Sequence, residues 1–107
     1  MTSQNPVSYI RFCNEGDRDS LLDFVRDGHN ESAVFTMSDA KVKKVIDHAI
    51  NPPKDENGNV NHVVIIGIID APDSSGKIAA SIAIEYNQMW YSDDWVLYEL
   101  WNKVRIL

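Results

Sequence analysis

The pattern of apolar and polar positions predicts two amphipathic helices in the first half of the chain. In residues 38–51, apolar side chains recur at the spacing of one buried helical face, with lysines on the outward side. Ser38 is a suitable N-cap for this helix, and the two prolines that follow the helix end it. A shorter apolar stripe predicts a helix over residues 18–27, with Asp17 as its N-cap and Gly28 at its end.

Four other segments have the period and composition of strands. Residues 62–70 and 78–86 are almost continuously apolar and β-branched, which is typical of strands buried on both faces, and the turn sequence between them predicts a hairpin. Residues 7–13 are the first predicted strand and residues 95–104 the last. The resulting order, β-α-α-β-β-β, predicts an α+β fold in which two helices cover a mostly antiparallel sheet.

Composition and charge are those of an ordinary globular domain. Hydrophobic residues make up 44% of the chain and charged residues 24%, so a modest core is expected. The 107 residues fit one domain over 7–107, after a disordered lead-in at 1–6. The net charge of −6 argues against nucleic acid or an anionic membrane as a partner. Acidic and basic residues are interleaved, which does not favour DNA mimicry either.

Signals for membranes, metals and phosphate loops are weak. No apolar run has the length of a membrane span and no secretory signal is present, so a cytoplasmic protein is predicted. Cys13 is the single cysteine and the three histidines are scattered, so we expect neither a disulfide nor a metal site. His29 and Glu31 form an H-x-E pattern, but the cysteine pair of a zinc deaminase is missing. The SSGK sequence at 74–77 lacks the spacing of a phosphate loop and is interpreted as a hairpin turn.

Several short segments are similar to one known family. YIRFCNEGDRDSLLDFV joins a strand, an acidic turn and an apolar helix, GHNESAVF contains His-x-Glu-Ser, and WYSDDWVLYELWNKV leads into the last strand. In these segments and in its element order, the chain from residue 8 to 104 resembles the first half of the GCN5-related N-acetyltransferases, in particular a bacterial and phage branch. The resemblance implies transfer of an acetyl group from acetyl-CoA to an amine.

The resemblance also implies roles for individual residues. Glu99, on the last strand, corresponds to the family's general base, which deprotonates the acceptor amine. The positions implied in binding are Asn102, Lys103 and Val104 for acetyl-CoA and His29 and Glu31 for the acceptor. The family's glycine-rich pyrophosphate loop does not follow Val104, which predicts poor cofactor binding by this chain alone. Three explanations stay open: a truncated or split gene, a half-domain completed by a partner or second copy, or a scaffold reused for binding.

The last predicted strand and the turn before it concentrate aromatic residues. The candidates for a protein interface are Trp90, Tyr91, Trp95, Tyr98 and Trp101. With regular alternation, Trp95, Glu99 and Trp101 share one face, Tyr98 lies on the other, and both faces are apolar. Such a strand at a sheet edge predicts a homodimer or a bound protein partner. Two functions follow as alternatives: an acetyltransferase completed by a partner, or a non-catalytic phage-type module that modulates a host protein.

Overall fold

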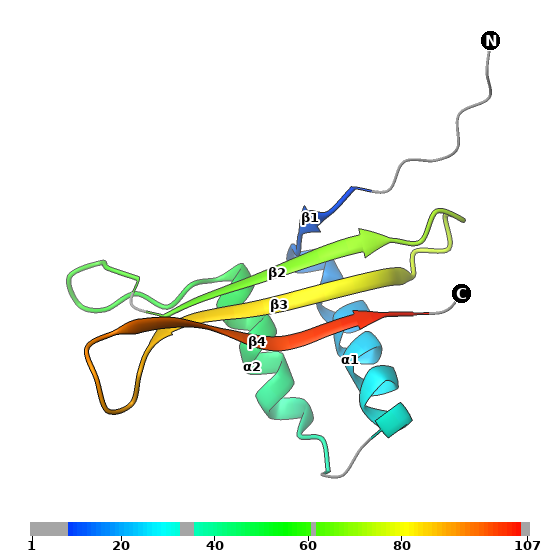
Figure 1. Cartoon of the computed structure of the whole chain (residues 1–107). Coiled ribbons are helices and arrows are strands. Elements are labelled where there is room, and N and C mark those ends of the chain that lie inside the picture. The colour runs from blue at the N-terminus through cyan, green and yellow to red at the C-terminus, as the bar shows by residue number, and fades with distance from the viewer. Residues whose placement is uncertain (1–8, 33–35, 61, 106–107) are drawn as a thin grey trace.

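The computed structural model describes residues 9–32, 36–60 and 62–105, with the side chains of 31 and 32 excepted, and forms two helices on a four-stranded sheet (Figure 1). Its elements are β1 (Arg11–Phe12), the short 3-10 turn η1 (Glu15–Asp17), α1 (Arg18–Ser32), α2 (Asp39–Ile50), β2 (Val63–Asp70), β3 (Ile78–Gln88) and β4 (Trp95–Val104). The strands lie in the order β1-β2-β3-β4, and every neighbouring pair is antiparallel. The predicted α+β class and element order are confirmed. The proposed lead-in at 1–6 lies outside the described residues.

The helix starts follow from capping side chains. Ser38 accepts a hydrogen bond from the Lys41 amide at 3.3 Å, which confirms it as the N-cap of α2. The first helix begins differently from the prediction. Asn14 caps the η1 turn by accepting from the Gly16 amide, while the Asp17 carboxylate accepts from the Asn14 amide at 2.7 Å. Asp17 is therefore the second half of a capping box and not the N-cap of α1.

The first helix also ends later than predicted. It continues through Gly28 to the end of α1, because Gly28 does not take the left-handed conformation with which glycine stops a helix. At this position the helix lies against a side chain of β4. A Cβ atom at Gly28 would lie 3.4 Å from Cε of Lys103, so the lysine side chain crosses the helix at this position.

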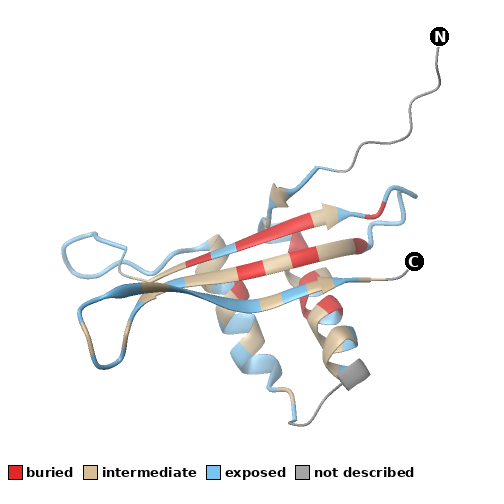
Figure 2. Ribbon diagram, in the orientation of Figure 1, coloured by how far each residue is buried: buried red, intermediate tan, exposed pale blue. Residues whose placement is uncertain are grey.

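The core lies between the helices and one face of the sheet, where the buried residues are concentrated (Figure 2). Alternate residues of β2 point into it, and the apolar stripes of both helices meet them there. The fully or nearly fully buried members of this cluster are Leu21, Leu22, Phe24, Ile46, Val64, Ile66, Ile68, Ile78 and Ala83. The stripes that the sequence predicted for the two helices are thus the faces that they bury.

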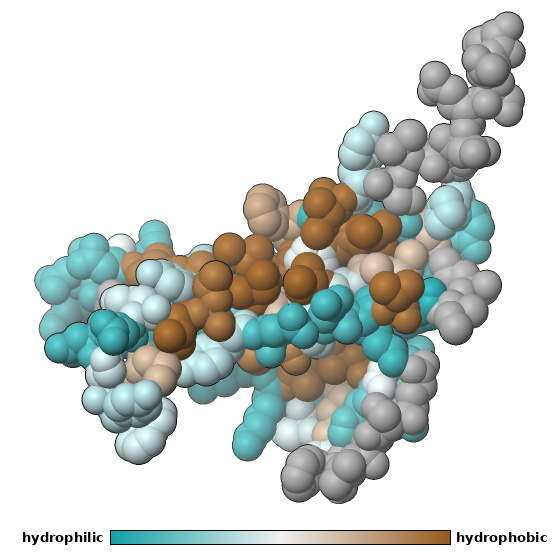
Figure 3. All heavy atoms as spheres, viewed as in Figure 1, coloured by the Kyte–Doolittle hydropathy of each residue, from teal (hydrophilic) through white to brown (hydrophobic). Residues whose placement is uncertain are grey.

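The opposite face of the sheet is not covered by any described element, and the prediction of strands buried on both faces is wrong for that reason. Ile65 is 46% exposed, whereas its neighbour Ile66 is 1% exposed. Figure 3 shows apolar side chains gathered across the strands on this side of the molecule. The Ile10 side chain lies on this uncovered face, directly above Gly67. A Cβ atom added to Gly67 would be 2.7 Å from the Ile10 Cδ1 atom.

A β-bulge in β4 changes which side chains share a face. Trp101 pairs with Ala83 and Glu99 pairs with Ile84, so Leu100 between them has no Cα partner. The extra residue inverts the alternation along the strand. Trp101 consequently points toward the helices and packs against the core, away from the face that holds Glu99. The predicted grouping of Trp101 with Trp95 and Glu99 is wrong.

Candidate functional site

Within the described part of the chain, the fourth strand is the longer of the two edge strands of the sheet, the other being the two-residue β1. Over Trp95–Val104 the fourth strand pairs with β3 on one side and with no described strand on the other. Its outer backbone groups are therefore open to another polypeptide. Most of its side chains are exposed, including Leu97 at 69% and Val104 at 70%. Two residues turn inward toward α1: Trp101, whose indole N–H donates to the Ser81 hydroxyl at 3.0 Å, and Lys103.

A cleft of about 290 Å³ separates the C-terminal half of α1 from the C-terminal half of β4. Its walls include Phe24, Gly28 and His29 from the helix and Trp101, Asn102 and Lys103 from the strand. The structure therefore brings together His29, predicted to contact the acceptor, with Asn102 and Lys103, predicted to contact the cofactor.

Arg105 lines a neighbouring depression that shares Phe24, Gly28 and Lys103 with this cleft. Its guanidinium group pairs with the Asp27 carboxylate at 3.3 Å and lies 4.9 Å from the centre of the Phe24 ring. Both contacts join the end of β4 to α1. The sequence offered no signal for these contacts, because Arg105 and its partners are far apart along the chain.

The remaining predicted site residues lie elsewhere. Glu99 pairs in register with Ile84, which lines the uncovered face, and it is not part of the wall of the α1–β4 cleft. Its carboxylate makes no hydrogen bond or ion pair with another described residue. Val104 lies opposite Ala80 on the uncovered face. Glu31 is in the last turn of α1, but its side chain lies outside the described residues.

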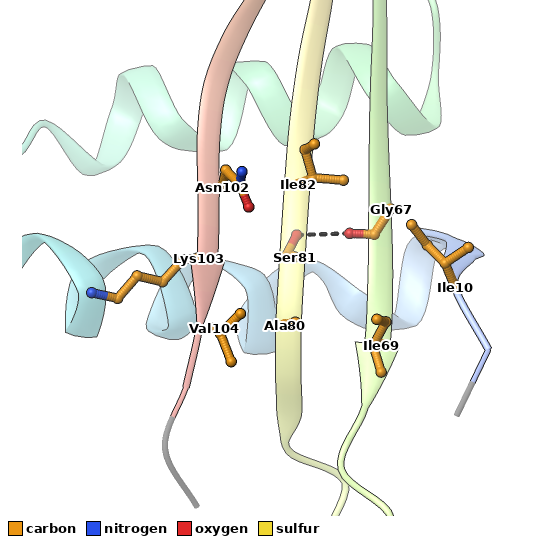
Figure 4. A pocket seen from close by; sticks show the side chains of 9 residues that line it. All are labelled: Ile10, Gly67, Ile69, Ala80, Ser81, Ile82, Asn102, Lys103 and Val104. Atoms are coloured by element: carbon orange, nitrogen blue, oxygen red, sulfur yellow. Dashed lines mark hydrogen bonds between the residues drawn. The ribbon is translucent and has the colours of Figure 1, made fainter. Parts of the chain in front are cut away.

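The uncovered face carries two shallow apolar depressions. One, of about 240 Å³, lies over the ends of β2, β3 and β4 and is bordered by Ile10, Ile69 and Val104 (Figure 4). The other, of about 250 Å³, continues along Ile65, Ile82 and Ile84. Both include Gly67 in their linings, because a residue without a side chain leaves the sheet surface low at this point. The Gly67 carbonyl accepts a 2.8 Å hydrogen bond from the Ser81 hydroxyl.

The turn between β3 and β4 forms an exposed aromatic tip, which extends beyond the sheet in Figure 1. Trp90 is 89% exposed and Tyr91 66% exposed, with their rings edge to face at 5.0 Å. Trp95 stacks on Tyr86 at 5.2 Å on the adjoining strands. A backbone hydrogen bond closes the turn: the Met89 amide donates to the Asp94 carbonyl at 2.9 Å.

The strongest electrostatic cluster lies away from these surfaces, at the start of the chain. Arg11 donates to the carboxylates of Asp17 and Asp70 at 2.7–2.9 Å. The hydrogen bonds from Arg11 hold the pKa of both carboxyl groups below their usual range. Nearby, burial raises the pKa of the Cys13 thiol, which favours its neutral form over a reactive thiolate. These residues join β1 to the helix start and to β2, which is a structural role.

Other kinds of site have little support in the described part of the chain. No group of three histidine, cysteine or carboxylate side chains among its residues is placed to hold a metal ion. No helix there is long and apolar enough to cross a membrane. Comparisons of this chain with protein-family models, curated proteins and solved structures gave no match.

Proposed function

We propose that this chain is a protein-interaction domain that accepts an extended segment of another polypeptide along β4. The observation that carries the proposal is the long edge at Trp95–Val104, which has no described neighbour on its outer side. Adding a strand to such an edge supplies main-chain hydrogen bonds for affinity, and side chains that alternate along the added strand supply specificity.

The composition of the edge supports this role. Edge strands that must not pair with another chain are protected by proline, by outward-pointing lysines or by short length. The ten residues of β4 include no proline, and their one lysine, Lys103, packs along α1. The bulge at Leu100, the charge of Glu99 and the inward-pointing Lys103 are protective features of this edge, and none of them lies in the part from Trp95 to Tyr98. An added strand would extend the sheet beyond β4. Its apolar side chains on one side would then lie next to the uncovered apolar face.

Hydrogen exchange tests the proposal directly. We expect a synthetic strand-forming peptide of alternating Val and Thr to slow amide exchange in β4, because the outer amides gain hydrogen-bond partners. Exchange in α2 (Asp39–Ile50), which is remote from the edge, is the internal control. Unchanged exchange in β4 at saturating peptide would contradict strand addition.

A second candidate function is acetyl transfer, favoured by the one cleft where His29, Asn102 and Lys103 meet. In that reaction the acceptor amine attacks the thioester carbonyl of acetyl-CoA, the CoA thiolate leaves, and a base takes the amine proton. The resemblance assigns that base to Glu99, but Glu99 lies on the face of β4 opposite to this cleft, so another residue would have to take the proton there. A partner strand on β4 would complete the site. The two candidates are therefore compatible.

Acetyl-CoA binding tests this second candidate. Ligand at about 100 times its dissociation constant adds roughly 2.7 kcal/mol, which raises the melting temperature by on the order of ten degrees. Lys103→Met keeps the side-chain length but removes the charge, and we expect it to reduce the shift. Lys77→Met, in the exposed β2–β3 turn, is the matched control. Absence of any shift in the parent protein would rule out cofactor binding by this chain alone.

A further inference from the structure

Acidic residues outnumber basic ones in the hairpin formed by β3 and β4, whose one lysine, Lys103, lies near its C-terminal end beside α1. Residues 78–102 contain Glu85, Asp93, Asp94 and Glu99 but no lysine or arginine. Residues 55–76 likewise contain no lysine or arginine, but there Asp70 pairs with Arg11, and in the first 54 residues the two signs are interleaved. The strand that offers the free edge therefore belongs to a predominantly acidic hairpin.

Most of this negative charge is not neutralised within the structure. The carboxylates of Asp93, Asp94 and Glu99 have no ion pair with any described residue, whereas Glu85 lies 3.0 Å from the His62 ring nitrogen. The arginines are already engaged outside the hairpin. Their ion pairs are Arg11 with Asp17 and Asp70, Arg18 with Glu15 and Asp47, Arg26 with Asp23 and Asp39, and Arg105 with Asp27.

Exposed aromatic rings lie next to the two aspartates at the tip. Tyr91 is separated from Asp93 by one residue and Trp90 by two. The Gln88 side chain holds the turn by donating a hydrogen bond to the Asp93 carbonyl at 2.9 Å. Aromatic faces attract arginine and lysine side chains, and carboxylates pair with the same groups. Both features of the tip thus suit one kind of ligand.

We propose that the partner of β4 is a cationic segment of another protein, with arginine or lysine side chains that contact Trp90, Tyr91, Asp93 and Asp94. This inference rests on the strand addition proposed above and adds the chemical class of the partner. A second copy of the chain fits less well. Its edge strand belongs to the same acidic hairpin, and the whole chain has a net charge of −6, so self-pairing opposes like charges.

Three peptides of equal length, with Val alternating with Arg, Thr or Glu, test the charge of the partner. Binding is followed by tryptophan fluorescence and by hydrogen exchange in β4. We expect the Arg peptide to bind most tightly and the Glu peptide most weakly, with the preference for Arg decreasing as salt is added. The double variant Asp93→Asn/Asp94→Asn should weaken binding of the Arg peptide by about fivefold or more. Asp73→Asn, in the β2–β3 turn, should leave it unchanged.

The outcomes separate this inference from the proposal on which it rests. Equal affinity for the three peptides, with β4 protected by each, would overturn the cationic preference and keep strand addition. Tight binding of the Arg peptide that depends on Asp93 and Asp94, without protection of β4, would keep cationic recognition and overturn strand addition. Binding of no peptide, with a dimer seen in sedimentation, would overturn the inference in favour of a second copy.

Discussion

At the scale of single residues, Trp101 differs from the other two tryptophans in having a buried polar partner. Its indole N–H donates to Ser81, and Ser81 donates to the Gly67 carbonyl, so the three strands β2, β3 and β4 are linked through side chains. We expect Trp101→Phe to lower the free energy of unfolding by about 1–2 kcal/mol, because a hydrogen bond and some packing are lost. Urea denaturation measures this, with the exposed Trp90→Phe as a control. Equal effects of the two variants would show that Trp101 does not face the core.

Asp17 provides a prediction at the same scale for the effect of pH. The Arg11 hydrogen bonds lower the pKa of Asp17 in the folded protein below its unfolded value of about 3.9. Its contribution to stability is therefore complete above about pH 4 and is lost as pH falls through the folded pKa. We expect Asp17→Asn to be destabilising at neutral pH and this difference to shrink in acid. Urea denaturation at both pH values checks it, and a difference that does not change with pH would contradict the assignment.

At the scale of elements, the bulge makes one residue of β4 dispensable. Leu100 has no Cα partner, and the residues on either side of it already pair with consecutive residues of β3. Deleting Leu100 would leave the faces of Trp101 and Glu99 as they are, whereas deleting Tyr98 would shift the register of one part of the strand. We expect the Leu100 deletion to retain more stability than the Tyr98 deletion in thermal melts. The reverse order would mean that the bulge lies elsewhere.

At the scale of the whole molecule, the two faces of the sheet differ in how much packing they contribute. Ile65 and Ile66 are neighbours on β2 that point to the uncovered and covered faces. We expect Ile66→Ala to cost about 2–5 kcal/mol of folding free energy and Ile65→Ala less than about 1 kcal/mol. Denaturant titration of dilute protein makes the comparison. Similar losses would indicate that something covers the second face in solution.

Local patterns were sufficient for most of the secondary structure, since helix stripes, capping residues and turn sequences act over a few neighbouring positions. They placed α2 from its Ser38 cap and the strands β2, β3 and β4 to within a few residues. They failed at Gly28, which has the residue type of a helix end but contacts Lys103 of a distant strand. They also led to the wrong prediction that both faces of the sheet are buried. An apolar run does not reveal whether other elements pack on one face of a strand or on both.

The sequence by itself determined the α+β order, the amphipathic helix faces, the acidic hairpin and its aromatic content. These properties depend on composition and on the spacing of apolar residues within a short segment, without contacts to the rest of the chain. Only the tertiary structure decided that a bulge turns Trp101 inward and that His29 meets Asn102 and Lys103 in one cleft. Those features arise from strand order, register and long-range contacts, each of which depends on residues far apart in the chain.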